Sequence, residues 1–149
     1  MSEQKNDDFK FTAQELMYSI SYRMETCIRQ FYEPFGLTTP QAMIILYIHR
    51  NGRGKVTEVA NHLHMTNSNL STICRRLERD GFLIRTRDLE DQRIVWLSLT
   101  EHCEQRIREI DQKIDSQYLN NLNGVSKEDG EVILAGLTKL NEILCRTVK

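Results

Sequence analysis

Arginines cluster in and around a charged segment, RDLEDQRIVWLSLT at residues 87–100, which turns abruptly into an apolar run. Arg85, Arg87 and Arg93 carry guanidinium groups, whose planar fork pairs well with phosphate oxygens. Asp91 stands two positions before Arg93 and can hold that guanidinium by a charge-assisted hydrogen bond. Arg93 is therefore our first candidate for contact with a phosphate or with the minor groove of DNA.

A second set of polar side chains lies upstream, on a segment with helical periodicity. Apolar residues at spacings of three and four predict its buried stripe: Leu70, Ile73, Cys74 and Leu77. The other face offers short polar groups followed by arginines, as a helix inserted in a major groove requires. Its candidate DNA-binding residues are Thr66, Asn67, Ser68, Asn69, Ser71, Thr72, Arg75 and Arg76. An ordinary surface helix whose charges serve solubility remains the alternative.

These side chains need a scaffold, and the segment VTEVANHLHMTNSNLSTICRRLERDGFL predicts a helix-turn-helix. Thr57 begins a short first helix, and HMT at 64–66 makes a tight turn. Either Thr66 or Asn67 caps the second helix, because both side chains accept hydrogen bonds from free backbone N–H groups. Gly81 is a natural residue just beyond its C-terminal end.

A hairpin follows directly. FLIRTRD at 82–88 and RIVWLSLT at 93–100 are rich in strand-forming residues, and the polar turn LEDQ separates them. In the second run Ile94, Trp96 and Ser98 alternate with Val95, Leu97 and Leu99, and one of these two rows is expected to be buried against the helices. Thr100 is suited to cap the next helix. The helix-turn-helix thereby gains a wing that carries the arginines.

Long helices flank this centre. Thr12 is expected to cap the first helix, which stops at Pro34, while Thr39 and Pro40 open the second helix. A very short strand is expected at Lys55 and Val56. Three apolar stripes belong to the flanking helices: Leu16, Ile20, Met24, Ile28 and Phe31; Ile107, Ile110, Ile114 and Tyr118; and Ile133, Leu137, Leu140 and Leu144. Ser126 caps the last helix. The stripes favour burial across a two-fold axis, with a monomeric helical bundle as the alternative.

The charge balance is uneven along the chain. The 149 residues carry a net charge of -1, yet residues 50–95 hold nine Lys or Arg against six Asp or Glu. A local excess of cations is what phosphate binding requires, although solvated helix faces also reach such values. No apolar run approaches the roughly 20 residues of a membrane span. We therefore expect a cytoplasmic protein without a membrane partner.

Other chemistry finds little support. No phosphate loop, nucleophile elbow or HExxH motif is present, so we expect no enzyme, no catalytic residue and no cofactor. The histidines are scattered, which argues against a metal site. Cys27, Cys74, Cys103 and Cys145 lie 29 to 47 positions apart, unlike a disulfide framework or a zinc ribbon. Free cysteine usually behaves as a small buried hydrophobe, and this is the expectation for Cys27.

The residues of the wing carry a resemblance to a known family. A helix-turn-helix followed by D-x-R-x-x-x-hydrophobic-x-L-T resembles the multiple-antibiotic-resistance regulator (MarR) family of bacterial transcription factors. The motif residues here are Asp91, Arg93, Leu97, Leu99 and Thr100. LTTPQ at 37–41 and LERDGFLIRTRD at 77–88 agree with the same family. Members often have Pro after the first aspartate of the wing, whereas this chain has Leu89 after Asp88. They also often have a second Arg before the motif arginine, whereas this chain has Gln92 before Arg93.

The resemblance implies a homodimer of winged lobes on a palindromic DNA operator, usually a repressor released by a small molecule, an oxidant or a metal. Because some members of the family use a cysteine in the N-terminal region, the resemblance also makes a peroxide-sensing thiol the alternative role of Cys27. The expected fold is mainly α (α+β), a winged helix-turn-helix with long N- and C-terminal helices forming a dimerisation lobe. We expect one domain over 1–149, with the DNA-binding lobe at 39–99 and the dimerisation lobe at 10–34 and 100–149.

The expected function is that of a DNA-binding transcriptional regulator. Its expected partners are double-stranded DNA, a second copy of the chain and a small-molecule effector. The alternative function is a winged-helix module that binds protein without sequence-specific DNA binding, which the near-neutral net charge favours.

Overall fold

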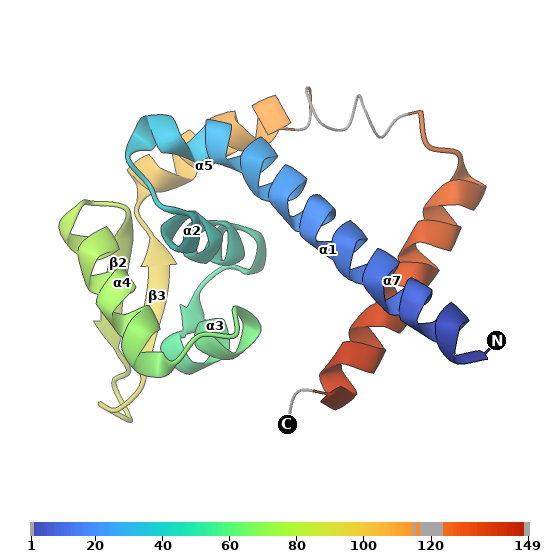
Figure 1. The fold of residues 1–149 in the computed structure, drawn as a ribbon. Coiled ribbons are helices and arrows are strands. Elements are labelled where there is room, and N and C mark those ends of the chain that lie inside the picture. The colour runs from blue at the N-terminus through green and yellow to red at the C-terminus, as the bar shows by residue number, and fades with distance from the viewer. Residues whose placement is uncertain (1, 115, 117–123, 148–149) are drawn as a thin grey trace. The chain divides into compact units, whose positions relative to one another are not determined.

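The computed structural model describes residues 2–114, 116 and 124–147. The chain divides into two compact units, residues 1–111 and 112–149. The elements are α1 (Ser2–Tyr32), the 3-10 turn η1 (Glu33–Phe35), α2 (Thr39–Asn51), β1 (Gly54–Lys55), α3 (Val56–His62), α4 (Asn67–Arg79), β2 (Leu83–Arg87), β3 (Val95–Leu99), α5 (Glu101–Ile114) and α7 (Lys127–Thr147). Figure 1 shows α2, α3 and α4 gathered beside the small sheet.

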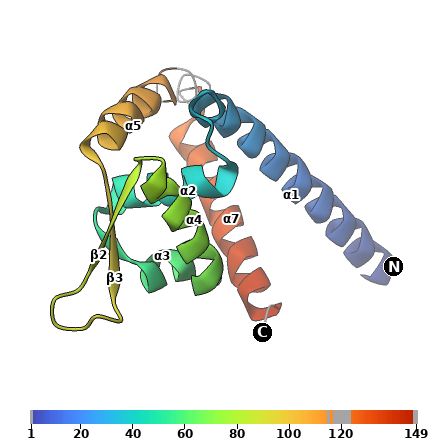
Figure 2. The same ribbon diagram turned by 90° about the vertical axis from the view of Figure 1, so that its left-hand side faces the viewer.

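The sheet is antiparallel, with strand order β1-β3-β2. Strands β2 and β3 form the expected hairpin, in which Leu83 pairs with Leu99 and Arg87 with Val95. The two-residue β1 adds a third strand, because Lys55 pairs with Trp96 of β3. In Figure 2 the loop of the hairpin projects beyond α3 and α4. The prediction of a mainly α fold with a winged helix-turn-helix is confirmed.

Local signals place α4 where the sequence predicts it. Thr66 is the N-cap, since its Oγ1 accepts a hydrogen bond of 3.2 Å from the Asn69 backbone N–H. The helix ends at Arg79, and Gly81 then adopts a φ of +80°, a left-handed conformation that suits glycine. Leu70, Cys74 and Leu77 of the predicted apolar stripe are fully buried, whereas Ile73 is half-buried.

The core of the first unit lies between these helices and the sheet. Side chains from successive elements are almost fully excluded from solvent: Ile44, Ile45, Ile48, Val59, Ala60, Leu70, Cys74, Leu77, Leu83, Leu97 and Cys103. In the alternating row of β3, Leu97 and Leu99 are buried whereas Val95 is half-buried. No polar or charged residue of the described part is buried, so the core is apolar.

Helix α5 packs its stripe and is tied to α2. The side chain of Thr100 accepts a hydrogen bond of 3.2 Å from the Cys103 N–H, which confirms the predicted cap. Ile107 and Ile110 are buried, whereas Tyr118 lies outside the described residues. His49 of α2 is flanked by two α5 carboxylates, 2.8 Å from Glu104 and 3.1 Å from Asp111.

The last helix is described by itself. Ser126 caps α7, as predicted: its Oγ accepts a hydrogen bond of 3.0 Å from the Asp129 N–H and donates one of 2.8 Å to the Asp129 carboxylate. Ile133, Leu137 and Leu144 of its apolar stripe are exposed. In the described part of the chain, no helix is both long and apolar enough to cross a membrane.

Several predicted boundaries are wrong. Helix α1 begins at Ser2 and runs through Thr12, and neither Gly nor Pro interrupts residues 2–32. Helix α2 is capped by Thr38 rather than Thr39, since Gln41 accepts from the Thr38 N–H at 2.9 Å and completes a capping box.

The strand and the helix next to it are each shifted by one residue. Strand β1 covers Gly54–Lys55 and α3 begins at Val56, whereas the sequence predicted a strand at Lys55 and Val56 and a helix start at Thr57. The Lys55 backbone N–H donates to Glu58 over 3.0 Å, which sets the helix start at Val56. Several neighbouring residues can make such a capping hydrogen bond, and the sequence pattern does not say which of them does. Errors of one residue in the predicted helix and strand boundaries are therefore expected.

Candidate nucleic-acid interface

The outward face of α4 is a line of four polar residues. Ser68, Thr72, Arg75 and Arg79 follow helical spacing opposite the buried stripe, and all four are exposed. Hydrogen bonds link the first three, from the Thr72 hydroxyl to the Ser68 carbonyl at 3.0 Å and from the Arg75 guanidinium to the Thr72 hydroxyl at 3.1 Å. The first turn of α4 also exposes Asn67, directly after the cap residue Thr66, which is itself exposed.

Other predicted α4 residues lie to either side of this line. Ser71 faces the wing and is half-buried. Arg76 is exposed and lines a shallow hollow with the start of α2, including Thr38 and Gln41. Asn69 is exposed, and its backbone N–H is occupied by the Thr66 cap. The helix therefore presents its polar residues over a broad surface, with Ser68 and Thr72 at the centre.

The wing loop leaves the side chain of Arg93 almost fully exposed to solvent. The Arg93 side chain is 91% exposed, and its guanidinium donates to both carboxylate oxygens of Asp91 at 3.0 and 3.1 Å. These hydrogen bonds from Arg93 lower the pKa of Asp91 and raise that of Arg93, so both groups stay charged at neutral pH. A two-pronged pair of this kind orients the guanidinium while leaving part of it open to a ligand.

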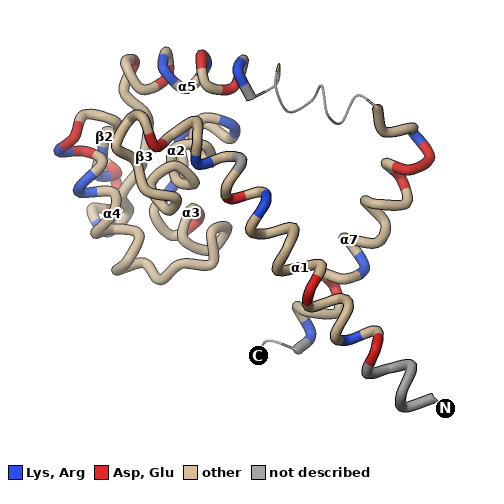
Figure 3. The backbone as a smooth tube through the Cα atoms, turned by 45° about the horizontal axis from the view of Figure 1, so that its top comes forward, with Lys and Arg blue, Asp and Glu red and all other residues tan. Residues whose placement is uncertain are grey.

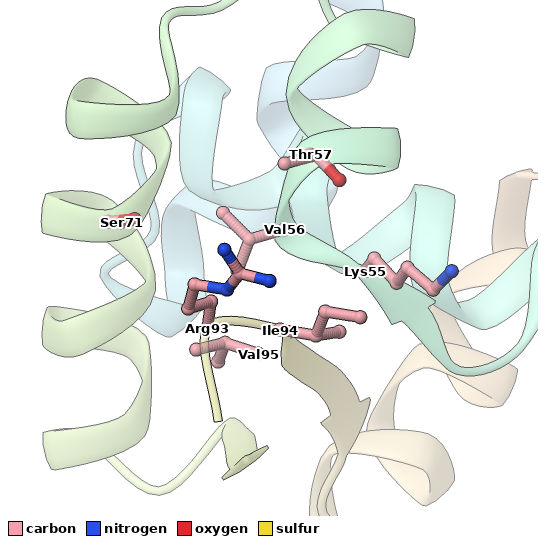
Figure 4. Close-up of a pocket in the computed structure, with 7 residues that line it drawn as sticks. All are labelled: Lys55, Val56, Thr57, Ser71, Arg93, Ile94 and Val95. Carbon is pink, nitrogen blue, oxygen red and sulfur yellow. The ribbon is translucent and has the colours of Figure 1, made fainter. Parts of the chain in front are cut away.

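A hollow separates the wing from the helices. It is lined by Lys55, Val56, Thr57, Ser71, Arg93, Ile94 and Val95. Figure 4 shows Arg93 reaching from the wing loop into the space between α4 and the start of α3, with Lys55 pointing away from it. The structure thus brings Ser71 of the predicted recognition helix and Arg93 of the wing to the two sides of one groove.

The other two wing arginines have partners within the fold. Arg85 is half-buried, with its guanidinium 3.6 Å from the Glu78 carboxylate of α4, and its Nε lacks a hydrogen-bond partner among the described residues. Arg87 is exposed and donates to the Gln92 carbonyl across the loop at 2.9 Å. Arg85 therefore tethers the wing to α4, while Arg87 braces the loop and keeps an exposed charge. Figure 3 shows how basic and acidic residues alternate over this part of the chain.

The sequence interpretation missed a polar cluster at the root of the wing. Asp88 accepts a hydrogen bond of 2.8 Å from the Trp96 indole Nε1. The guanidinium carbon of Arg53 lies 4.4 Å from the centre of the same indole ring, and the Lys55 ammonium lies 5.2 Å from it. One signal in the sequence could have predicted this cluster. Trp96 lies in the row of the second strand that also holds Ser98, and Asp88 precedes it across the short turn of the hairpin.

Two of the cysteines, Cys74 and Cys103, are buried. Burial raises the pKa of Cys74 and of Cys103 from 9.0 to about 11. Their thiolate fraction at pH 8 is then about a hundredfold below that of a thiol with a pKa of 9. Cys145 is exposed, and the Cys27 side chain lies outside the described part.

We expect this difference to appear in thiol labelling. In a C27S/C145S variant, Cys74 and Cys103 should react with Ellman's reagent at pH 8 at least about tenfold more slowly than Cys145 does in C27S. Labelling should accelerate as the pH approaches 11, because the thiols then ionise, and on unfolding. Fast labelling of the folded C27S/C145S protein at pH 8 would contradict the assigned burial.

Among the residues that the structure describes, no group of three or more His, Cys, Asp or Glu side chains could hold a metal ion. The groups that the candidate interface offers are hydroxyls and guanidinium groups on α4 and guanidinium groups on the wing.

Comparison with known proteins identifies the chain. A family model described as the MarR family matches residues 37–95, from the entry to α2 through the wing to the start of β3. Residues 37–95 form a MarR-family domain. The matched residues include α4 and the Asp91–Arg93 pair described above.

Relatives of this chain are named as regulators. It is 28% identical over 108 residues to the uncharacterized HTH-type transcriptional regulator YfiV of Bacillus subtilis, which covers 72% of this chain and 68% of YfiV. It is 31% identical over 93 residues to the HTH-type transcriptional regulator FarR of Neisseria gonorrhoeae, covering 62% of this chain and 64% of FarR.

A solved structure extends the likeness to the whole fold. The S. aureus MepR–DNA complex superposes with a TM-score of 0.76 at 25% identity, covering 87% of this chain and 96% of the MepR chain. The resemblance read from the wing motif is thereby confirmed, together with the winged-helix architecture.

Proposed function

We propose that this protein is a DNA-binding transcriptional regulator that grips double-stranded DNA with α4 and the wing. The observation that carries the proposal is the outward line of Ser68, Thr72 and Arg75 on α4 beside a wing that holds Arg93 in solvent. A helix of this width fits the major groove, and an adjacent wing reaches the flanking backbone or minor groove. The DNA complex of the relative MepR supports the same mode of use.

Within this proposal the side chains divide by role. Ser68 and Thr72 are short enough to approach base edges, and with Asn67 they would read sequence. Arg75, Arg79 and Arg93 carry exposed charges that would pair with phosphates or guanine. Arg85 would act indirectly by holding the wing against α4, because Glu78 already occupies its guanidinium.

We further propose that the active form is a homodimer on a palindromic operator. Apolar side chains are exposed on α1 and on α7 of the single chain: Phe9, Phe11, Leu16, Tyr18, Ile20, Tyr22, Met24, Val132, Ile133, Leu134, Leu137, Ile143 and Leu144. A second copy would cover such surfaces and place two α4 helices about one DNA turn, roughly 10 bp, apart. The boundaries 10–34 and 100–149 for this lobe, and 39–99 for the DNA-binding lobe, are part of the proposal.

The proposed cellular role is that of a cytoplasmic repressor whose DNA binding a small-molecule effector relieves, without catalytic activity of its own. The relatives' designation as regulators supports the regulatory role. A winged-helix module that binds protein is the second candidate, because Asp88, Glu90 and Asp91 make the wing loop acidic as well as basic.

Selection from a random duplex DNA pool tests the proposal. The purified protein should enrich an inverted repeat whose half-sites are centred about 10 bp apart. An enriched single half-site would refute the dimeric form of the proposal. Absence of any enrichment at low salt would refute DNA binding and favour the protein-interaction candidate.

A further inference from the structure

The single tryptophan of the chain joins the wing loop to the sheet. Trp96 lies on the central strand β3, where it pairs with Lys55 of β1 on one side and with Thr86 of β2 on the other. Its ring is half-buried, and its Nε1–H donates a hydrogen bond of 2.8 Å to Asp88 Oδ2. A hydrogen bond to a charged acceptor is among the stronger ones in proteins, so this contact constrains where the loop leaves β2.

The ring itself is held by two cations. The Arg53 guanidinium carbon lies 4.4 Å from the ring centre and the Lys55 ammonium 5.2 Å from it, both within the range of cation–π attraction. Lys55 is also 3.7 Å from the Glu58 carboxylate. These contacts from the β1 segment limit rotation of the indole and so keep its N–H directed at Asp88.

Asp88 also binds the backbone of the wing loop. Its Oδ1 accepts from the backbone N–H groups of Glu90 and Asp91 at 3.0 and 3.1 Å. Trp96 is the largest cause of a lowered pKa at Asp88, followed by these backbone hydrogen bonds, so the carboxylate stays charged at neutral pH. One carboxylate thus fixes both the strand and the backbone at Asp91.

Asp91 is the residue that holds Arg93. Its carboxylate accepts from the Arg93 backbone N–H at 3.0 Å as well as from the guanidinium at 3.0 and 3.1 Å. The contacts therefore form an unbroken series from the Trp96 indole through Asp88 and Asp91 to the Arg93 guanidinium. The loop achieves this order without proline, since Leu89 follows Asp88.

We propose that Trp96 is a positioning residue for DNA binding, which acts through Asp88 and Asp91 to hold the Arg93 guanidinium where the DNA backbone passes. The inference rests on the proposed function. An ordered guanidinium loses less rotamer entropy on binding than a free one, so the series raises affinity without touching DNA. The alternative is a purely structural tryptophan that stabilises the sheet and has no connection with Arg93.

A double-mutant cycle separates these two roles. W96F keeps an aromatic ring for Arg53 and Lys55 but removes the N–H donor, so it should weaken binding of the selected duplex about tenfold, measured by anisotropy of labelled DNA. In an R93A background, W96F should change affinity by less than about twofold, because the group it positions is gone. In an R75A background the tenfold loss should persist.

Two outcomes would overturn the inference: W96F binding as tightly as wild type, or the same loss in the R93A and R75A backgrounds. Circular dichroism and thermal unfolding establish that each variant is folded. Should W96F fail to fold, D88N decides the question in the same cycle, because it keeps the indole and removes the charged acceptor. The same two outcomes apply to D88N.

The emission of Trp96 offers a test that needs no DNA. No other tryptophan contributes, so the emission reports on this indole alone. D88N should alter the emission intensity of the folded protein, whereas the matched change D80N, on an aspartate bonded to Arg79 instead, should not. Equal emission in wild type and D88N would refute the hydrogen bond between Trp96 and Asp88. If the emission shows this hydrogen bond but the wild-type protein binds no duplex, the proposed function fails and the hydrogen bond stands.

Discussion

Replacing Arg93 with alanine is expected to weaken binding of every duplex by about a hundredfold, because each wing of a dimer loses one phosphate contact worth about tenfold. The change should affect all sequences alike, since a contact with the backbone carries no sequence information. The 91% exposed side chain is bonded only to Asp91 among the contacts described above, so the fold should be unaffected. Anisotropy titrations of selected and scrambled duplexes measure the effect.

R108A provides the matched control. Arg108 is an exposed arginine on α5, so its loss removes the same charge outside α4 and the wing. Binding by R108A should stay within about threefold of wild type, the size of a change in long-range attraction alone. Equal losses for R93A and R108A would show that net charge, and not the wing, governs binding.

Replacing Leu97 with alanine is expected to lower the free energy of unfolding by about 3 kcal/mol. Leu97 is fully buried on β3, where it pairs with Gly54 of β1 and Arg85 of β2. Truncation leaves a cavity that both the sheet and the helices border, so few neighbours can move in to fill it. Urea denaturation followed by circular dichroism measures the loss.

L89A makes the same chemical change on a surface residue. Leu89 lies in the wing loop with 94% of its area exposed, so its truncation should alter stability by less than about 0.5 kcal/mol. A Leu97→Ala protein as stable as the Leu89→Ala protein would contradict the placement of β3 at the centre of the core.

The helix-turn-helix and the wing could be predicted because their signals are local. The Thr66 cap, the apolar spacing of α4 and Gly81 all lie in one short segment, residues 66–81, and each signal depends only on residues close in sequence. The hairpin follows from two strand-forming runs and a polar turn. The pairing of Asp91 with Arg93 spans two positions, so it too was visible in the sequence.

Contacts across elements could not be predicted. Arg85 looked like a wing cation, but it faces Glu78 seven residues earlier on α4, a neighbour set by how the hairpin packs on that helix. The Asp88 and Trp96 pair depends on the register of β2 with β3, and the Arg53 contact depends on β1 joining the sheet. Side-chain direction on a strand reverses with a shift of one residue, so such contacts need coordinates.

The salt dependence of duplex affinity tests the central claim most directly. If α4 and the wing pair their guanidinium groups with DNA phosphates, the logarithm of the association constant should fall linearly with the logarithm of salt concentration. The slope should be about -0.9 for each phosphate contacted, and therefore steeper than about -3 for a dimer. A flat dependence, or no binding to any duplex at low salt, would contradict the account.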